Sequence, residues 1–117
     1  MDSEISVKIV HQNDVSAGQV DIPGASGITI QWLIGPDDGA PNFYTRRFTI
    51  EPGGNTPRHS HPHEHEVYIL SGEGECFIDG QWHTFEKDYA ILVPPAVEHQ
   101  FRSISDKPVV LLCIIPK

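Results

Sequence analysis

Residues 53–72 read GGNTPRHSHPHEHEVYILSG, and this stretch decides how the chain is interpreted. It holds four histidines at alternating positions, His59, His61, His63 and His65. Alternate side chains of an extended chain project to the same face. Pro62 and the glycine-rich approach interrupt regular strand geometry, so alternation alone does not select the ligands. Because neutral imidazole binds Mn, Fe, Co, Ni, Cu and Zn, the stretch indicates a divalent-metal site.

Glycine and proline, ten of each, divide the chain into short β-branched and aromatic runs. These runs predict strands over residues 28–34, 43–51, 65–70, 76–79, 82–86, 89–93 and 109–115. Turn signals separate them at residues 52–55, 71–74, 79–80, 94–95 and 105–108. The sharpest is Asp79-Gly80, since both residue types tolerate the positive φ of a two-residue hairpin turn. No segment has a sustained helical period, so the pattern predicts an all-β sandwich or barrel.

Length and charge narrow the classes of function. The 117 residues fit one domain, which should bury a sufficient core without disulfides or a structural metal, so a metal here is expected to be functional. The net charge of −8 disfavours binding to nucleic acid or anionic lipid. No apolar run approaches the roughly 20 residues of a membrane span. The acidic start, Met1 to Glu4, does not resemble a signal peptide, so we expect a cytoplasmic protein with reduced Cys76 and Cys113.

The histidine stretch resembles the first motif of the cupins, which runs Gly, five residues, His-x-His, three or four residues, Glu, six residues, Gly. Gly53, His59, His61 and Gly72 match this pattern. The usual glutamate position then holds His65. Glu66 is the alternative, since a gap of four residues is also allowed, but it leaves only five residues before the final glycine. Adjacent strand residues point to opposite faces, so only one of the two can reach the metal, and we favour His65.

A second stretch resembles the other cupin motif, Gly, five residues, Pro-x-Gly, two residues, His, three residues, Asn. Pro94 and His99 match it, whereas Asp88, Ala96 and Ser103 replace the glycines and the asparagine. The departures leave the path of this loop open, but His99 is still expected to be a ligand. The resemblance covers about residues 43–115.

The resemblance implies a double-stranded β-helix, or jelly-roll, barrel. We expect a single domain over residues 1–117, with the barrel at about 43–115 and N-terminal strands within 1–40. Members of this class often pair edge strands between two copies, which covers exposed edges, so we expect a homodimer.

The segments at Ala40 to Phe43 and Arg58 to Pro62 are similar to those of small bacterial cupins with a four-histidine manganese site. That similarity implies manganese held by His59, His61, His65 and His99, with two positions open. Fe, Ni, Zn and Cu are alternatives, because affinity for a nitrogen-rich site rises from Mn to Cu.

Three other residues are candidates for the pocket. Arg46 and Arg47 face opposite ways on one strand, and Arg46, which fits the family pattern, is expected to meet an anionic substrate unless it forms a surface ion pair. Phe101 shares the face of His99 and is a candidate pocket wall. Cys113 is expected inside the barrel, beside the metal or as a small apolar filler. The remaining aromatic residues are assigned to the core, an interface or, for His63, the surface: Tyr68, Trp82, Trp32, Phe85 and His63.

Four neutral ligands would leave the ion with its full +2 charge, which favours anionic ligands such as carboxylates or enolates. We expect an oxygenase-type oxidoreductase acting on a small organic substrate. The alternatives are an isomerase or lyase, which would need a positioned base, and a non-catalytic module that binds a small anionic metabolite. The sequence offers only Glu98 beside His99, on the opposite face, which argues against the isomerase and lyase alternatives.

Overall fold

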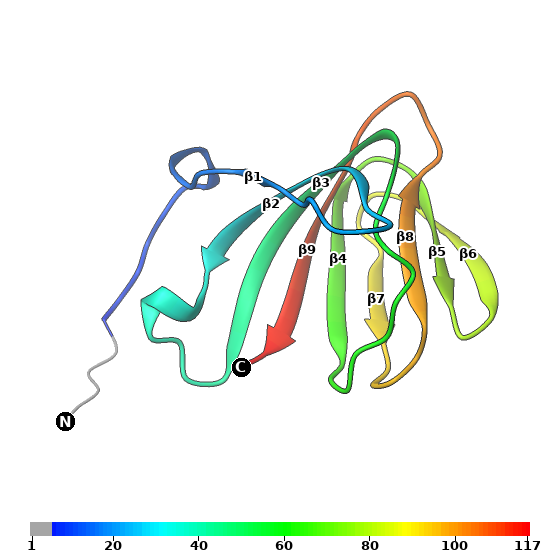
Figure 1. Ribbon diagram of the computed structural model, residues 1–117. Coiled ribbons are helices and arrows are strands. Elements are labelled where there is room, and N and C mark those ends of the chain that lie inside the picture. The colour runs from blue at the N-terminus through cyan, green and yellow to red at the C-terminus, as the bar shows by residue number, and fades with distance from the viewer. Residues whose placement is uncertain (1–5) are drawn as a thin grey trace.

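The computed structural model describes residues 6–117 and is built almost wholly of strands (Figure 1). Two short 3-10 helices, η1 (Gln12–Asp14) and η2 (Pro36–Asp38), accompany the strands. The strands are β1 (Gly18–Gln19), β2 (Ser26–Ile34), β3 (Phe43–Asn55), β4 (His65–Ser71), β5 (Gly74–Ile78), β6 (Gln81–Phe85), β7 (Ala90–Val93), β8 (His99–Ser103) and β9 (Val109–Pro116). In the part of the chain described here, no helix is long and apolar enough to cross a membrane.

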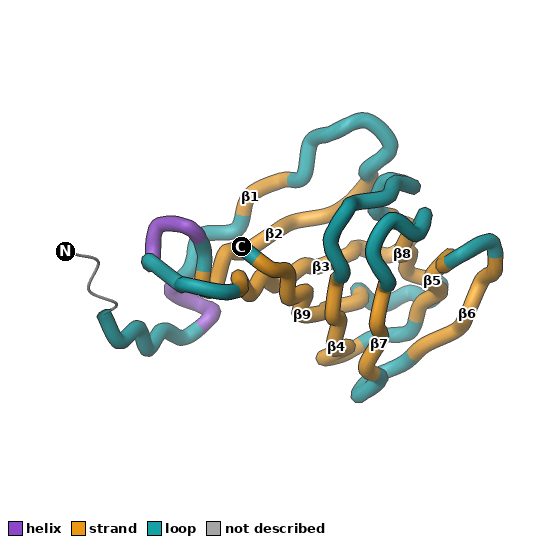
Figure 2. Tube along the Cα trace, turned by 90° about the horizontal axis from the view of Figure 1, so that it is seen from below, coloured by secondary structure: helices purple, strands orange, loops and turns teal. Residues whose placement is uncertain are grey.

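The strands form one sheet that curls into a barrel-like half shell (Figures 1 and 2). Their order is β6-β5-β8-β3-β9-β4-β7, with β2 added to β3 and β1 added to β2. The curl depends on β3, which pairs with β9 from Phe43 to Ile50 and meets β8 only at Asn55. The residues of β3 between Ile50 and Asn55 bend this strand away from β9 and towards β8.

The bend in β3 corrects one sequence expectation. Residues 52–55 were expected to form a turn between strands, but they belong to β3. Gly53 has φ 79°, and the register with β2 shifts between Ser26 and Ile28, so the glycines form a bulge inside the strand. The other turn signals behave as expected, and Asp79 (φ 51°) and Gly80 (φ 84°) close the β5–β6 hairpin.

Inward-facing side chains fill the half shell. In β4 every second residue is buried, beginning with His65, because one face of the strand meets the core. The core consists of Ile28, Ile50, Val67, Ile69, Cys76, Phe85, Val93, Phe101, Val109, Leu111 and Cys113. Most of these come from strands expected from the sequence, but β8 was not among them. Its alternating polar residues gave a weak signal, and pairing with β5 makes the segment a strand.

Two positions where the second motif lacks its glycines adopt the conformation that glycine favours. Asp88, between β6 and β7, has φ 72°, and Ala96, in the loop between β7 and β8, has φ 64°, so both are left-handed. For residues with a Cβ this costs about 1–2 kcal/mol each. The Ala96 amide donates a hydrogen bond to the His61 carbonyl (2.6 Å), which ties this loop to the histidine stretch.

Candidate metal centre

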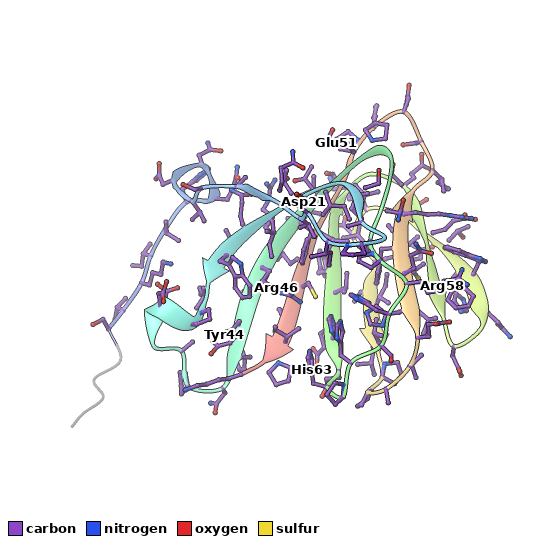
Figure 3. The ribbon with its side chains drawn as sticks, viewed as in Figure 1. Asp21, Tyr44, Arg46, Glu51, Arg58 and His63 are labelled. Carbon is purple, nitrogen blue, oxygen red and sulfur yellow. The ribbon has the colours of Figure 1, made fainter. Side chains whose placement is uncertain are left out.

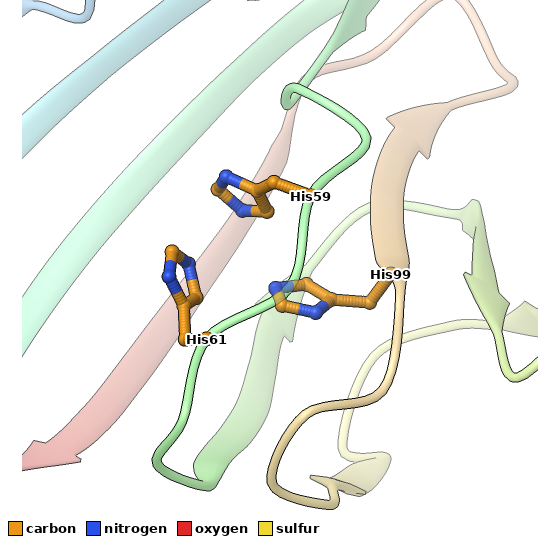
Figure 4. A group of neighbouring side chains, drawn as sticks. All are labelled: His59, His61 and His99. Atoms are coloured by element: carbon orange, nitrogen blue, oxygen red, sulfur yellow. The ribbon is translucent and has the colours of Figure 1, made fainter.

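Three imidazoles gather inside the half shell (Figure 4). They belong to His59, His61 and His99, and their candidate ligand atoms all lie within 4.8 Å of one another. His59 and His61 lie on the connection between β3 and β4, whereas His99 opens β8. The backbones of His59 and His99 hydrogen-bond to each other in both directions (3.1 and 2.8 Å). This bridge joins the two sequence motifs and brings their histidines together.

The orientation of the His99 ring is fixed by a backbone group. Its Nδ1 lies 3.0 Å from the Val97 carbonyl oxygen. A carbonyl only accepts hydrogen bonds, so Nδ1 carries the proton and Nε2 keeps its lone pair. Metal-binding histidines commonly show this arrangement, in which a backbone acceptor sets the tautomer.

His65 lies against the same group of rings. It is 8 % exposed, and its ring centroid lies 4.9 Å from that of His61 and 5.1 Å from that of His99. Its Nδ1 is 3.3 Å from Cys113 Sγ, and its Nε2 is buried without a hydrogen-bond partner. Glu66, the alternative ligand, is exposed on the other face of β4. The role of His65 as a ligand stays a prediction.

Burial and mutual repulsion keep the imidazoles of His59, His61 and His65 neutral. Desolvation, reinforced by neighbouring His61 and His99, lowers the pKa of His59 to about 4. Desolvation first, and then neighbouring His99 and Arg46, lower the pKa of His65 to about 3. The pKa of His61 is also lowered, again chiefly by burial. Since only the neutral ring offers a lone pair to a metal, these three rings are in the form that binds one at pH 7.

The rings line a cavity of about 320 Å³, which suits a small organic molecule. Its walls are mostly apolar, including Val20, Ile22, Ile28, Ile30, Phe48 and Leu111. No Asp or Glu lines it among residues 6–117. The only permanently charged side chain in this lining is that of Arg46. The cavity therefore combines neutral nitrogen donors, apolar walls and one cation.

Arg46 reaches into the cavity from β3 (Figure 3). Its Nη2 donates to Cys113 Sγ at 3.0 Å, and its guanidinium lies 5.0 Å from the Phe48 ring and 5.6 Å from the Trp32 ring. Arg47 points to the opposite face, where it donates to Gln31 Oε1 (2.9 Å). The surface ion pair considered for Arg46 is absent from the described residues.

The two other candidate residues also line the cavity. Phe101 is buried and packs against Phe85, with ring centroids 6.0 Å apart. Cys113 is buried beside His65 and Arg46, and burial raises the pKa of its thiol, which therefore stays protonated at pH 7. The structure thus brings together all the residues singled out in the sequence, while their catalytic roles stay predictions.

Sequence reasoning missed part of the site. His63 was expected at the surface, but it is half-buried, with its ring stacked on those of His61 (5.2 Å) and His65 (5.0 Å). Trp32, assigned to the core or an interface, is 41 % exposed and lies outside the cavity lining, with its ring 5.6 Å from the Arg46 guanidinium. The walls from Val20 to Ile30 were also missed. The sequence indicated only that residues 28–34 alternate as in a strand. The pairing of β2 with β3 is what places Ile28 and Ile30 of that strand in the cavity wall.

The fold and site define a β-barrel protein whose clustered imidazoles could hold a divalent metal ion. Residues 46–115 match the family described as "Cupin domain". The chain belongs to the cupin family, and its half shell is the double-stranded β-helix that the sequence predicted.

Solved and curated relatives agree with this assignment. The polyketide cyclase RemF from Streptomyces resistomycificus shares 34 % sequence identity, with a TM-score of 0.89, over 95 % of this chain and 80 % of that chain. The polyketide synthase CurC of Streptomyces cyaneus is 29 % identical over 70 residues, 59 % of this chain and 46 % of the relative. The 1-methylthio-D-xylulose 5-phosphate methylsulfurylase of Rhodospirillum rubrum is 30 % identical over 70 residues, 60 % of this chain and 45 % of the relative. The matched region spans about half the length of these curated relatives.

Proposed function

We propose that His59, His61, His65 and His99 together hold one divalent metal ion. The single observation that carries the proposal is the buried Nε2 of His65, which has no hydrogen-bond partner in a ring that lies beside those of His61 and His99. A buried polar atom without a partner costs about 1–3 kcal/mol, and a metal ion would remove that cost. Manganese is our first candidate, with iron, nickel, zinc and copper as alternatives that the same nitrogen donors accept.

Two variants on adjacent residues test the fourth ligand. We expect His65→Ala to lower metal affinity by about 10- to 100-fold, measured by competition with a chromophoric chelator. Glu66→Gln, which changes the other face of β4, should leave the affinity unchanged. The reverse result would assign the role to Glu66.

We further propose that the protein is an enzyme that closes a ring in a chain carrying several carbonyl groups, as in polyketides. Support comes from the 34 % identity to a polyketide cyclase over nearly the whole chain, and from a cavity that joins apolar walls to imidazole donors. A divalent ion here would supply a Lewis acid for a substrate oxygen. In an aldol closure, the carbon between two carbonyls loses a proton and bonds to a third carbonyl carbon. Water leaves when the ring becomes aromatic, so no oxidant is needed.

The residues of the chain would bind and orient this substrate. The apolar walls formed by Ile28, Ile30 and Phe48 would exclude water and hold the carbon chain folded. Arg46, which lies beside Cys113 and His65 in the same cavity, would hold a second, anionic oxygen of the substrate. The missing carboxylate base is a smaller obstacle for this substrate class, because a carbon between two carbonyls is already acidic and water suffices as the proton acceptor.

Oxygenase chemistry is the second candidate, favoured by the all-nitrogen donor set in an apolar cavity. Cyclase and oxygenase activity can be distinguished by incubating metal-loaded protein with a synthetic poly-β-ketone, with and without air. A cyclase gives the same ring, with loss of water, in both conditions and none after metal removal. An oxygenase consumes O₂ and adds oxygen to the product. Binding without turnover under either condition would instead support a metabolite-binding module.

We also infer a homodimer. The outward faces of β4 and β7 expose Tyr68 (41 %) and Leu92 (58 %), which supports association with a second copy. Sedimentation velocity of the wild type and of Leu92→Lys would test this, since a charge at that position should shift the equilibrium towards monomer.

A further inference from the structure

The two imidazoles that begin strands share a feature that the other two lack. His65 and His99 each have Nδ1 engaged, and Nε2 of His65 is buried without a hydrogen-bond partner. For His99 the partner of Nδ1 is a backbone carbonyl, whereas for His65 it is the thiol sulfur of Cys113. A carbonyl is an obligate acceptor, but a thiol can accept or donate. The tautomer of His65 therefore depends on what else contacts this sulfur.

Arg46 makes that second contact. Its Nη2 lies 3.0 Å from Cys113 Sγ, and a guanidinium only donates hydrogen bonds. The sulfur is thus an acceptor for the guanidinium. The second contact has two possible directions, because the thiol S–H can donate to His65 Nδ1 or Nδ1–H can donate to the sulfur. Only the second leaves the lone pair on His65 Nε2, so a metal ion bound at Nε2 selects the arrangement in which the sulfur accepts from both side chains.

The sheet register explains why these three residues meet. Cys113 of β9 pairs directly with Arg46 of β3 on one side and with Val67 of β4 on the other. Val67 and His65 are two residues apart and face the same way, so the sulfur lies between the guanidinium and the imidazole. Cys113 is 4 % exposed, so its sulfur has little access to bulk water.

We propose that Cys113 is a positioning residue, whose sulfur accepts from His65 Nδ1 and Arg46 Nη2 at once. It orients His65 Nε2 towards the other three histidines and holds the guanidinium against the cavity wall. Cys113 touches neither substrate nor metal in this role. The inference rests on the proposed metal site, because it assigns His65 as a ligand.

The test measures the tautomer as well as the metal. In zinc-loaded protein, nitrogen-15 NMR of the His65 ring should show the proton on Nδ1. In Cys113→Ala we expect a shift of the population towards Nε2–H and a loss of metal affinity of about 10- to 100-fold. Cys113→Ser keeps an acceptor at this position and should restore most of the affinity and the original tautomer.

Cys76→Ala is the matched control, because Cys76 is equally buried in the same core and no hydrogen bond joins it to an imidazole in the described chain. It should lose stability but keep both the tautomer of His65 and the metal affinity. Wild-type tautomer and affinity in Cys113→Ala would overturn the inference. If His65→Ala itself keeps full affinity, the four-histidine site fails instead, while the tautomer measurement still decides whether Cys113 orients the ring.

Discussion

The four histidines divide into two pairs with different supports. His65 and His99 open strands, are 8 % and 4 % exposed, and have Nδ1 engaged by a fixed neighbour. His59 and His61 lie on the connection between β3 and β4 and are only half-buried. Neither ring of this second pair has a hydrogen-bond partner within residues 6–117. The rings of His65 and His99, which we call the strand pair, are therefore oriented by the fold. The rings of His59 and His61, the loop pair, are held only through their backbone.

The difference indicates how such a site works. In the proposed four-histidine site, imidazoles fixed by sheet pairing would form half of the metal site before any ion arrives, which would reduce the entropy lost on binding. The loop imidazoles would adjust to ions of different size and to a changing number of bound oxygens. A rigid half and an adjustable half suit an ion that must exchange ligands while it stays bound.

The largest expected effect is on stability and arises in the backbone next to β4, the strand that begins with His65. Gly72 directly follows β4 with φ 90°, and a Cβ there would collide with the Pro108 carbonyl oxygen and approach Val109 Cα to 2.8 Å. We expect Gly72→Ala to lower the free energy of unfolding by about 4 kcal/mol, through the left-handed strain and the collision together. Urea denaturation measures this change.

Gly53, which precedes the loop pair, is the matched control. Its φ is 79°, but a Cβ there would meet no atom within 4 Å. Gly53→Ala should therefore cost only the backbone strain, about 1–2 kcal/mol. Equal losses in the two variants would show that the loop side is packed as tightly as the strand side and would contradict the comparison.

The next effect separates the ligands themselves. His99→Ala removes a ligand oriented by the fold, and we expect metal affinity to fall by about 100-fold, or about 2.8 kcal/mol. His61→Ala should lose only about 10-fold, because water replaces a loosely held ligand more easily. Calorimetric titration of metal-free protein measures both, with exposed His83→Ala as the control. A larger loss for His61→Ala would reverse the assignment of the rigid and adjustable halves.

The smallest effect is on the pH dependence of stability without metal. The pKa values of His59 and His65 are lowered from 6.5 to about 4 and about 3, so between pH 6.5 and 4 the unfolded chain binds protons that the folded chain does not. The free energy of unfolding should thus fall as pH falls through this range, by about 1 kcal/mol for each imidazole between pH 7 and 5. His59→Ala and His65→Ala should each flatten this dependence, measured by urea denaturation at each pH. An unchanged slope would mean that the ring in question is solvated.

The sequence predicted much of this architecture because both motifs are local. His59, His61 and His99 follow from motif spacing, and the spacing to Gly72 favoured His65 over Glu66. The structure has His65 buried and Glu66 exposed on opposite faces of β4. The hairpin at Asp79-Gly80 followed from turn chemistry. The bulge at Gly53 was mistaken for a turn, because a glycine with positive φ serves both and only the pairing of β3 with β2 distinguishes them.

The sequence by itself determined the family, the β architecture and the histidines that could bind a metal, since these depend on residue type and on spacing along the chain. The tertiary structure alone decided what surrounds them. Only the pairing of β3, β9 and β4 puts Arg46, Cys113 and His65 in contact, across 67 and 48 positions of sequence. Only the pairing of β2 with β3 adds Ile28 and Ile30 to the apolar wall. Such contacts arise from the register between strands, which no local pattern in the sequence encodes.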